Sequence, residues 1–168
     1  MQNDLSRIRN DYSQRTLSKQ VVSKDPLEQM RLWLDEAIRS EVNEPTAMNL
    51  ATADSEGIPS SRMVLLKDLT DQGLVFYTNY NSRKGKQIEA NYYVALVFFW
   101  PELERQVRVE GRVEKADEEK ADEYFQSRPE LSRLAAWASD QSSAVPNRSY
   151  LENRMKALTE EFEGQHIP

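Results

Sequence analysis

The sequence predicts a mainly β protein with flanking helices (α+β), in which a small antiparallel β-barrel has helices on either side. Three observations support this prediction. Five short segments with strand-like patterns follow one another between residues 46 and 115, hairpin-length turns join the first three, and helical periodicity occurs before and after them. A chain of 168 residues has the usual size of one domain. We therefore expect a single domain over residues 25–168, preceded by a flexible N-terminal arm, residues 1–24.

The first helix is expected to begin at Asp25-Pro26. Asp25 suits the N-cap, Pro26 suits the first helical position, and apolar residues recur at three- and four-residue spacing from Leu27 to Ile38. The helix should end before Pro45, because the residue that precedes a proline avoids helical geometry. Residues 1–24 carry no sustained apolar period, which is why we interpret them as an arm.

Five strands are expected next. The first three cover 48–54, 61–68 and 74–79, and turn sequences separate them. The fourth, 93–100, is an unbroken apolar run, which is typical of a strand buried on both faces. The fifth, 105–115, alternates strictly, so that its valines share one face and its polar residues the other.

Four further helices complete the pattern. A short helix over 82–91 should have Ser82 as its N-cap. The other three show helical spacing of apolar residues and cover 118–125, 131–139 and 148–162. Residues 114–123 contain six acids and two lysines, hence four of the net −6 charges, and are expected to form a solvated helix face.

Composition excludes several kinds of chemistry. The chain has no Cys, which excludes thiolate nucleophiles, disulfide scaffolds and Cys-ligated metals. Its single His, His166, lies near the C-terminal end in an expected exposed tail, so a His-based triad or a multi-His metal site lacks its residues. We therefore expect no metal site and no protein nucleophile. Redox chemistry would require a bound cofactor.

The pattern of charge and hydropathy limits the possible partners. The pI is about 5.0 and the basic residues in the middle of the chain are sparse, so a single phosphate group is favoured over a polyanion. A small nucleic-acid-binding barrel stays a weak alternative. No apolar run approaches the ~20 residues of a membrane span, and the first residues lack the apolar stretch of a signal peptide, which together predict a cytoplasmic protein.

The strongest candidate binding residues lie on the second strand and at the start of the central helix. The segment RMVLLK places Arg62 and Lys67 at the two ends of an apolar strand. Ser82, Arg83 and Lys84 begin a helix, where free N–H groups and the helix dipole favour an anion. One phosphate could therefore meet a helix N-terminus and several cations. A cationic rim without a ligand explains Arg62 and Lys67 equally well.

These segments resemble, in order and spacing, the FMN-dependent pyridoxamine 5'-phosphate oxidases (pyridoxine/pyridoxamine phosphate oxidases) of vitamin B6 metabolism. The matching stretches are IRNDY (8–12), DPLEQMRLWL (25–34), EPTAMNLAT (44–52), RMVLLK (62–67), FYTNYNSRKGKQIEAN (76–91), LERQVRVEGRVEK (103–115), YFQSRP (124–129) and AAWASDQSS (135–143). The resemblance covers nearly the whole chain. It implies the FMN-binding split barrel, working as a homodimer with the flavin at the subunit interface.

The resemblance also implies two sets of binding residues. The residues that match the family's FMN contacts are Arg62, Met63, Val64, Leu65, Leu66, Lys67, Tyr77, Thr78, Arg83, Lys84, Gln106, Gln141 and Ser142. The first and last members of RMVLLK, with Arg83 and Lys84, match phosphate-binding groups, whereas Gln106, Gln141 and Ser142 match contacts made across the dimer. The residues that match the family's contacts with the pyridoxyl phosphate are Arg9, Tyr12, Lys67, Tyr124, Arg128 and Ser132.

Each of these residues also has an ordinary interpretation from the sequence alone. Gln106 lies among the solvent-facing residues of an alternating strand, and Gln141 and Ser142 lie in a plain loop. Arg128 precedes Pro129 and would simply end a helix. Tyr124 would be a half-buried anchor on an amphipathic helix.

The implied reaction is hydride removal from C4' of pyridoxamine or pyridoxine 5'-phosphate to flavin N5, reoxidation of the flavin by dioxygen to give hydrogen peroxide, and formation of pyridoxal 5'-phosphate.

Family members continue past the position of Ile167-Pro168 into a segment that supplies further flavin and substrate contacts. Three explanations are open. The sequence is part of a longer oxidase, which we favour, or a natural short form, or a non-catalytic FMN- or pyridoxal-phosphate-binding protein on the same scaffold.

Overall fold

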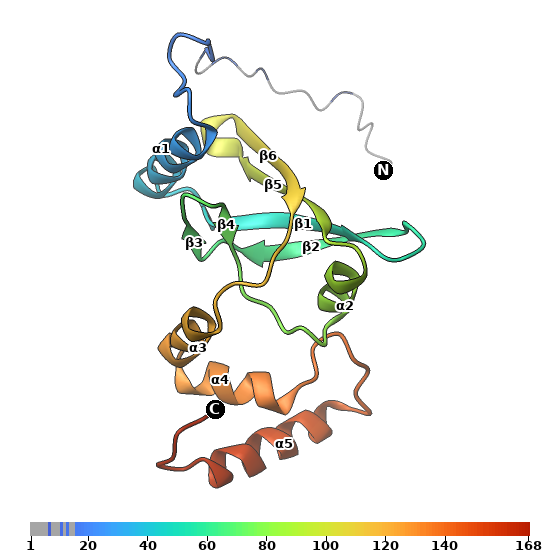
Figure 1. Ribbon diagram of the computed structural model, residues 1–168. Helices are drawn as coiled ribbons and strands as arrows, with labels where there is room; N and C mark the ends of the chain where they lie inside the picture. The colour runs from blue at the N-terminus through green and yellow to red at the C-terminus, as the bar shows by residue number, and fades with distance from the viewer. Residues whose placement is uncertain (1–6, 8–10, 12, 14–15) are drawn as a thin grey trace.

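Six antiparallel strands form two sheets in the part of the chain that the computed structural model describes, residues 7, 11, 13 and 16–168 (Figure 1). A four-stranded sheet has the order β2-β1-β5-β6, and a short hairpin pairs β3 with β4. The strands are β1 (Ala47–Ala53), β2 (Pro59–Leu65), β3 (Asp68–Leu69), β4 (Leu74–Val75), β5 (Tyr93–Trp100) and β6 (Arg105–Arg112). Every pairing is antiparallel, and helices flank the sheet on both sides in sequence. The predicted antiparallel α+β class is confirmed.

The helices begin close to where the sequence predicts. They are α1 (Pro26–Arg39), α2 (Arg83–Ala90), α3 (Glu118–Ser127), α4 (Glu130–Ala138) and α5 (Arg148–Glu161), with a short 3-10 turn at Pro101–Leu103. Both predicted N-caps are confirmed. The carboxylate of Asp25 accepts a hydrogen bond from the backbone N–H of Leu27 at 2.8 Å, and the Ser82 hydroxyl accepts one from Gly85 N–H at 3.2 Å.

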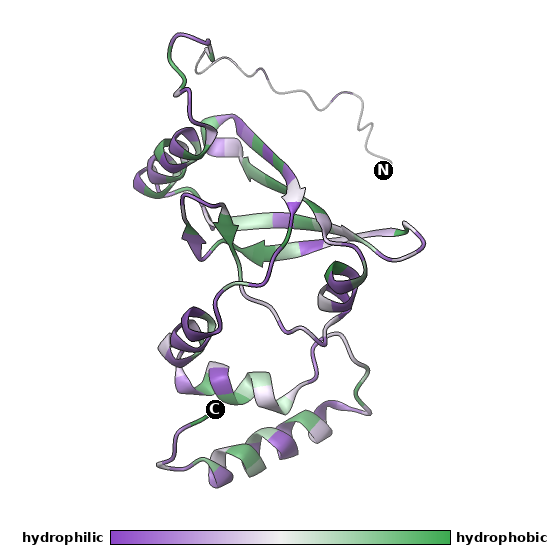
Figure 2. Ribbon diagram, in the orientation of Figure 1, coloured by the Kyte–Doolittle hydropathy of each residue, from purple (hydrophilic) through white to green (hydrophobic). Residues whose placement is uncertain are grey.

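The apolar core lies between α1 and one face of the four-stranded sheet. Its buried members from the sheet include Met48, Leu50, Leu96, Phe98 and Trp100. These residues alternate along β1 and β5, as a half-covered antiparallel sheet requires. Figure 2 shows apolar colour along β5 and in bands on β1 and β2, while α4 and α5 also carry apolar bands. The indole N–H of Trp100 donates to the Pro45 carbonyl at 2.9 Å, which ties the core to the loop after α1.

The prediction that residues 93–100 are buried on both faces is wrong. Leu96, Phe98 and Trp100 are buried beneath α1, but Tyr93 is 61% and Phe99 57% exposed. These two side chains lie on the sheet face opposite to the core, and the residues of β2 and β6 on that face are exposed as well. Sequence periodicity reports that both faces are apolar. Periodicity alone cannot show which of the two faces packs against other parts of the same chain.

The third predicted strand, 74–79, is also largely wrong. β4 ends at Val75, because its partner β3 offers only two residues to pair with. Tyr77 and Thr78 therefore lie in the loop that leads to α2 and not in a strand. The predicted alternation of RMVLLK is confirmed, since its burial alternates as far as Lys67 although β2 ends at Leu65.

Helices α3, α4 and α5 lie together at the end of the molecule opposite to α1 (Figure 1). The last residues fold back on them. Ile167 is buried, its carbonyl accepts from Gln126 Nε2 at 2.8 Å, and the Pro168 carbonyl accepts from Trp137 Nε1 at 2.8 Å. His166 is exposed, as predicted. No helix among the described residues combines the length and the apolar character needed to cross a bilayer.

Candidate functional site

Below α2, the covered face of the sheet changes from apolar to polar. Arg62 of β2 lies there, and all of its hydrogen-bond acceptors among the described residues are neutral. One terminal nitrogen donates to the Leu50 carbonyl at 3.1 Å and to Thr52 Oγ1 at 2.7 Å. The other donates to Ser60 Oγ at 2.6 Å and to Gln87 Oε1 at 3.3 Å. The guanidinium is fixed in place while its positive charge stays uncompensated.

A second cation, Lys84, lies in the first turn of α2 and is only 8% exposed. Its ammonium donates to the Ser82 hydroxyl at 3.4 Å and to Oε1 of Gln141, a residue of the loop after α4. Burial lowers the pKa of Lys84, and repulsion from Arg62 lowers it further. The pKa of Arg62 is lowered in the same way, first by burial and then by Arg83.

Arg62, Arg83 and Lys84 lie close together, and the described residues give them no acidic partner. Within residues 16–168, none of Arg62, Arg83 and Lys84 forms an ion pair with a carboxylate. They meet at the N-terminus of α2, where unpaired backbone N–H groups and the helix dipole favour negative charge. Burying the charge of Lys84 and half-burying that of Arg62 without a counter-ion is costly, so the arrangement favours the binding of an anion.

A cavity of about 480 Å³ runs along α2. The residues that line it are Asp54, Ser55, Asn81, Arg83, Lys86, Gln87, Ala90, Ser142 and Ser143. Ser142 adopts a left-handed backbone conformation, with φ of 68°. Thr78 Oγ1 donates to Gln141 Oε1 at 3.4 Å. The loop after α4 therefore brings Gln141 and Ser142 next to Thr78 and to the cations of α2.

A pair of aromatic rings forms the neighbouring part of the site. Tyr77 and Tyr124 of α3 stack with their ring centroids 4.0 Å apart and their planes 8° apart. The Lys67 ammonium lies 5.8 Å from the Tyr124 centroid. Burial raises the pKa of Tyr77, and the nearby Asp68 raises it further, so the phenol stays protonated at neutral pH.

The remaining predicted substrate residues lie at the junction of α3 and α4. A terminal nitrogen of Arg128 donates to the Ser132 carbonyl at 2.9 Å, and its guanidinium lies 5.5 Å from the Phe125 ring. The structure thus brings Lys67 to Tyr124 and Arg128 to Ser132, and α3 connects the two pairs. Arg9 and Tyr12 lie outside the described residues.

The structure does not bring Gln106 to the cations of α2. It lies on β6 opposite Phe99 and is exposed on the uncovered sheet face. Arg62 lies on β2, at the other edge of the sheet, and points to the covered face. Within one chain, Gln106 and the cations of α2 therefore belong to different surfaces. Met63 and Leu65 share the uncovered face with Gln106.

Three residues around Arg62 were missed by the sequence analysis, namely Thr52, Ser60 and Gln87. Ser60 shares a face of β2 with Arg62, and Thr52 is its register partner on β1. Polar residues that alternate in phase with an inward-facing arginine are the signal that could have found the two hydroxyls. Nothing in the sequence marks Gln87, because three positions beyond Lys84 it could equally be a solvent-facing residue of a short helix.

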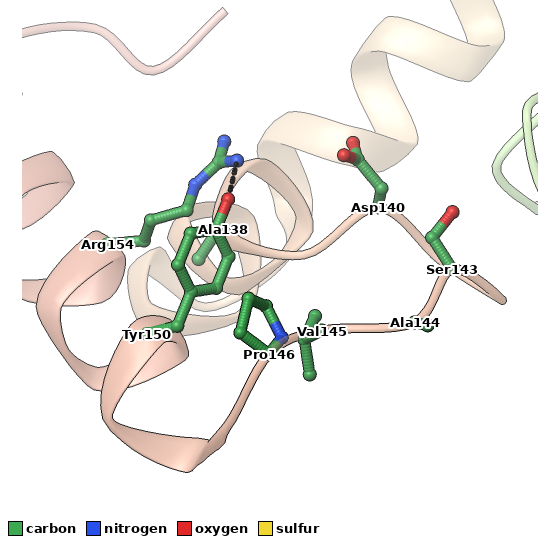
Figure 3. A pocket seen from close by; sticks show the side chains of 8 residues that line it. All are labelled: Ala138, Asp140, Ser143, Ala144, Val145, Pro146, Tyr150 and Arg154. Carbon is green, nitrogen blue, oxygen red and sulfur yellow. Dashed lines mark hydrogen bonds between the residues drawn. The ribbon is translucent and has the colours of Figure 1, made fainter.

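A smaller cavity, of about 130 Å³, lies between the loop after α4 and α5 (Figure 3). Its cation is already engaged, since Arg154 donates to Tyr150 Oη at 3.2 Å and to the Trp137 carbonyl at 3.0 Å. Figure 3 shows small apolar side chains along most of the remaining wall. This cavity fits a packing gap better than a binding site.

Similarity to known proteins shows which family the chain belongs to. Residues 34–160 match the family described as Pyridoxamine 5'-phosphate oxidase. The chain is 57% identical over 155 residues to pyridoxine/pyridoxamine 5'-phosphate oxidase of Neisseria meningitidis serogroup C (strain 053442), covering 92% of this chain and 74% of the relative. The chain belongs to the pyridoxamine 5'-phosphate oxidase family. The family resemblance and the enzyme class predicted from the sequence are thereby confirmed.

Other members and structural neighbours agree. The enzyme of the same name from Actinobacillus succinogenes (strain ATCC 55618 / DSM 22257 / CCUG 43843 / 130Z) is 57% identical over 148 residues, which is 88% of this chain and 70% of that one. PhzG from Burkholderia lata 383, solved with tetrahydrophenazine-1-carboxylic acid, superposes with a TM-score of 0.84 at 27% identity, over 91% of this chain and 76% of that one. A pyridoxamine 5'-phosphate oxidase-related, FMN binding protein from Nostoc punctiforme PCC 73102 shares the fold, with a TM-score of 0.57 at 19% identity over 78% and 73% of the two chains. The predicted split-barrel fold is confirmed, and FMN as the predicted cofactor agrees with the family.

Proposed function

We propose that this family member oxidises pyridoxamine 5'-phosphate and pyridoxine 5'-phosphate to pyridoxal 5'-phosphate, with FMN as its redox cofactor. The observation that carries the proposal is a pair of cations at the N-terminus of α2, the half-buried Arg62 and the buried Lys84, which have no carboxylate partner within residues 16–168. When bound, FMN supplies the acceptor for a hydride from C4' of the substrate and passes the electrons to dioxygen, which gives hydrogen peroxide.

The residues present fit the phosphate of FMN. A phosphate beside Arg62, Arg83 and Lys84 would supply the missing negative charge and would accept hydrogen bonds from the first N–H groups of α2. The other FMN-binding residues that we propose are Met63, Val64, Leu65, Leu66, Lys67, Tyr77, Thr78, Gln106, Gln141 and Ser142. Thr78 and Gln141 support this set, because their side chains meet within 3.4 Å next to Lys84.

The substrate phosphate is proposed to bind Lys67, Tyr124, Arg128 and Ser132. Lys67 has no carboxylate partner within residues 16–168, and Arg128 uses one terminal nitrogen on the Ser132 carbonyl, which leaves other N–H groups of its guanidinium for a phosphate. The chain's own part in the reaction is therefore to place the substrate ring and exclude water. Arg9 and Tyr12 complete the proposed set from outside the described residues.

We also propose that the protein is a homodimer with the cofactor at the interface. The uncovered face of the four-stranded sheet carries Met63, Tyr93 and Phe99, each more than half exposed. A patch of this kind is typical of a protein interface. Gln106 lies on that same face, so a second subunit would give it the access to a flavin that a single chain cannot.

The test begins with the purified, cofactor-free protein. Titration with FMN should quench the flavin fluorescence to a stoichiometric end-point, and the loaded protein should form pyridoxal phosphate from pyridoxamine phosphate with one hydrogen peroxide and one ammonium released per turnover. Protein that binds no FMN would overturn the proposal. Tight FMN binding without turnover would instead favour the non-catalytic binding protein.

A further inference from the structure

Arg62 and three neutral side chains form a closed ring of hydrogen bonds, in which Gln87 lies opposite Arg62. Arg62 donates to the hydroxyls of Thr52 and Ser60 at 2.7 and 2.6 Å. Each hydroxyl then donates its own proton to Oε1 of Gln87, at 2.7 and 2.8 Å. The same oxygen also accepts directly from Arg62 at 3.3 Å. Among the described residues, each side chain that accepts from Arg62 is therefore either Gln87 or a hydroxyl that donates to Gln87.

The orientation of the Gln87 amide follows from the donors around it. Both hydroxyl oxygens accept from the guanidinium, so their protons need an acceptor. An amide nitrogen in the place of Oε1 would face these protons and an N–H group of Arg62. Gln87 is 5% exposed and comes from α2, whereas Thr52 comes from β1 and Ser60 from β2. The ring thus joins the helix to both strands around the arginine.

The neutrality of this ring matters for an anion site. A glutamate at position 87 could accept the same hydrogen bonds, and more strongly, but its charge would cancel that of Arg62. A glutamine holds the guanidinium in place without neutralising its positive charge. Gln87 also lines the cavity along α2 together with Arg83, Lys86 and Ser142, so the ring borders an open space next to the helix.

We propose that Gln87 is a positioning residue, which holds Arg62 in place for the FMN phosphate and leaves its positive charge available. This inference rests on the FMN site proposed above. It adds a requirement that the site alone does not make, namely that the group behind the arginine must be an uncharged acceptor.

The test is the Gln87→Glu variant of the full chain, compared with wild type for FMN, for riboflavin and for thermal unfolding without ligand. The two flavins share the ring system, but riboflavin lacks the phosphate. FMN affinity should fall about ten- to a hundredfold, the scale of one charge-assisted hydrogen bond. Riboflavin affinity should stay unchanged, and the midpoint of unfolding should stay the same or rise, because the carboxylate keeps the ring closed.

Gln72→Glu is the matched control, since it makes the same charge change in the exposed turn between β3 and β4 and should leave FMN affinity unchanged. Gln87→Met is a second variant, which removes the acceptor without adding charge. It should weaken FMN more than riboflavin, by less than the glutamate does. Wild-type FMN affinity in Gln87→Glu, or equal losses for FMN and riboflavin in both variants, would overturn the inference. Wild-type protein that binds no FMN would contradict the proposed function, and this inference with it.

Discussion

Lys84 is the residue whose energetics depend most on the ligand. In the cofactor-free chain it is buried beside another cation, and its surroundings offer only neutral oxygens. Such a group destabilises the folded protein until an anion arrives, because the charged form has lost water without gaining a counter-charge. Part of the binding free energy of the anion would then come from relieving this destabilisation. The same residue should therefore affect stability and binding in opposite directions.

The Lys84→Met variant tests this opposition. We expect the cofactor-free variant to unfold at the same or a higher temperature than wild type, because a buried charge is replaced by an apolar chain of similar length. FMN affinity should fall by roughly tenfold or more. Thermal unfolding and fluorescence titration measure the two effects. Lys156→Met, which removes an exposed charge from α5, is the control and should change neither. A Lys84→Met protein that is less stable and binds FMN normally would contradict the argument.

The lowered pKa of Lys84 also predicts a pH dependence. Above its folded pKa, the folded cofactor-free protein binds fewer protons than the unfolded chain, whose lysines titrate near 10.5. Its stability should therefore rise with pH between the folded pKa and 10.5, and the gain is lost as pH falls through the folded pKa. A bound phosphate favours the protonated lysine, so FMN affinity should decrease over the same range.

The measurement is FMN affinity as a function of pH for wild type and for Lys84→Met. Subtracting the two curves removes the titration of the flavin itself and of the phosphate. A pH dependence that is identical in the two proteins would show that Lys84 does not carry it.

At the scale of elements, the start of α2 depends on a residue with no side chain. Gly85 lies against the turn that precedes the helix, where Ser82 Oγ donates to the Asn79 carbonyl at 2.6 Å. A Cβ at position 85 would lie 2.6 Å from the carbonyl carbon of Tyr80, closer than real contacts allow. The backbone of Tyr80 would have to move, and with it the cap that orients the first turn of α2.

Gly85→Ala should therefore lower the free energy of unfolding by about 1–3 kcal/mol, the usual cost of overpacking. FMN affinity should fall as well, since the N–H groups of the first turn move away from the phosphate. Gly111→Ala is the control, because its added Cβ meets no atom within 4 Å. Chemical unfolding and FMN titration decide the matter, and equal behaviour of the two variants would contradict it.

The sequence predicts elements best where a local signal is strong. The caps Asp25 and Ser82 and the spacing of apolar residues placed the starts of α1 and α2 to within a residue, because capping and amphipathicity act within one turn. The 74–79 strand failed for a reason that no local signal contains. A strand needs a partner, and β3 provides only two residues. The hairpin's length was set by its partner segment and not by the apolar character of Phe76 and Tyr77.

The candidate site divides in the same way. Arg62, Lys84 and the helix N-terminus follow from strand phase and capping, which a sequence displays. The ring through Gln87 depends on three elements that meet in space, and no spacing along the chain encodes that meeting. Tyr124 reaches Tyr77 across the gap between α3 and the loop before α2, which again only the tertiary structure reveals. The resemblance to a family supplied the residues that physics alone could not have selected.

At the scale of the whole molecule, the uncovered sheet face is the feature that a single chain leaves unexplained. Its apolar members face away from the core, and its strands are long enough to present them in a row. Exposing several large apolar side chains on one flat face is unfavourable in water. The proposed homodimer would cover this face and would bring Gln106 of each subunit to the cofactor of the other.

Phe99→Asp tests the homodimer and the shared site together. A carboxylate at this position would have to be buried in the interface, so the dissociation constant of the dimer should rise by roughly a hundredfold or more. FMN affinity should fall with it, because each site would lose the residues that the other subunit contributes. Sedimentation and FMN titration at matched protein concentrations should show the two losses in parallel. Leu32→Asp, at an exposed position of α1 outside the face, should change neither. A Phe99→Asp protein that stays dimeric, or a monomer that binds FMN as tightly as wild type, would contradict a cofactor site built from both subunits.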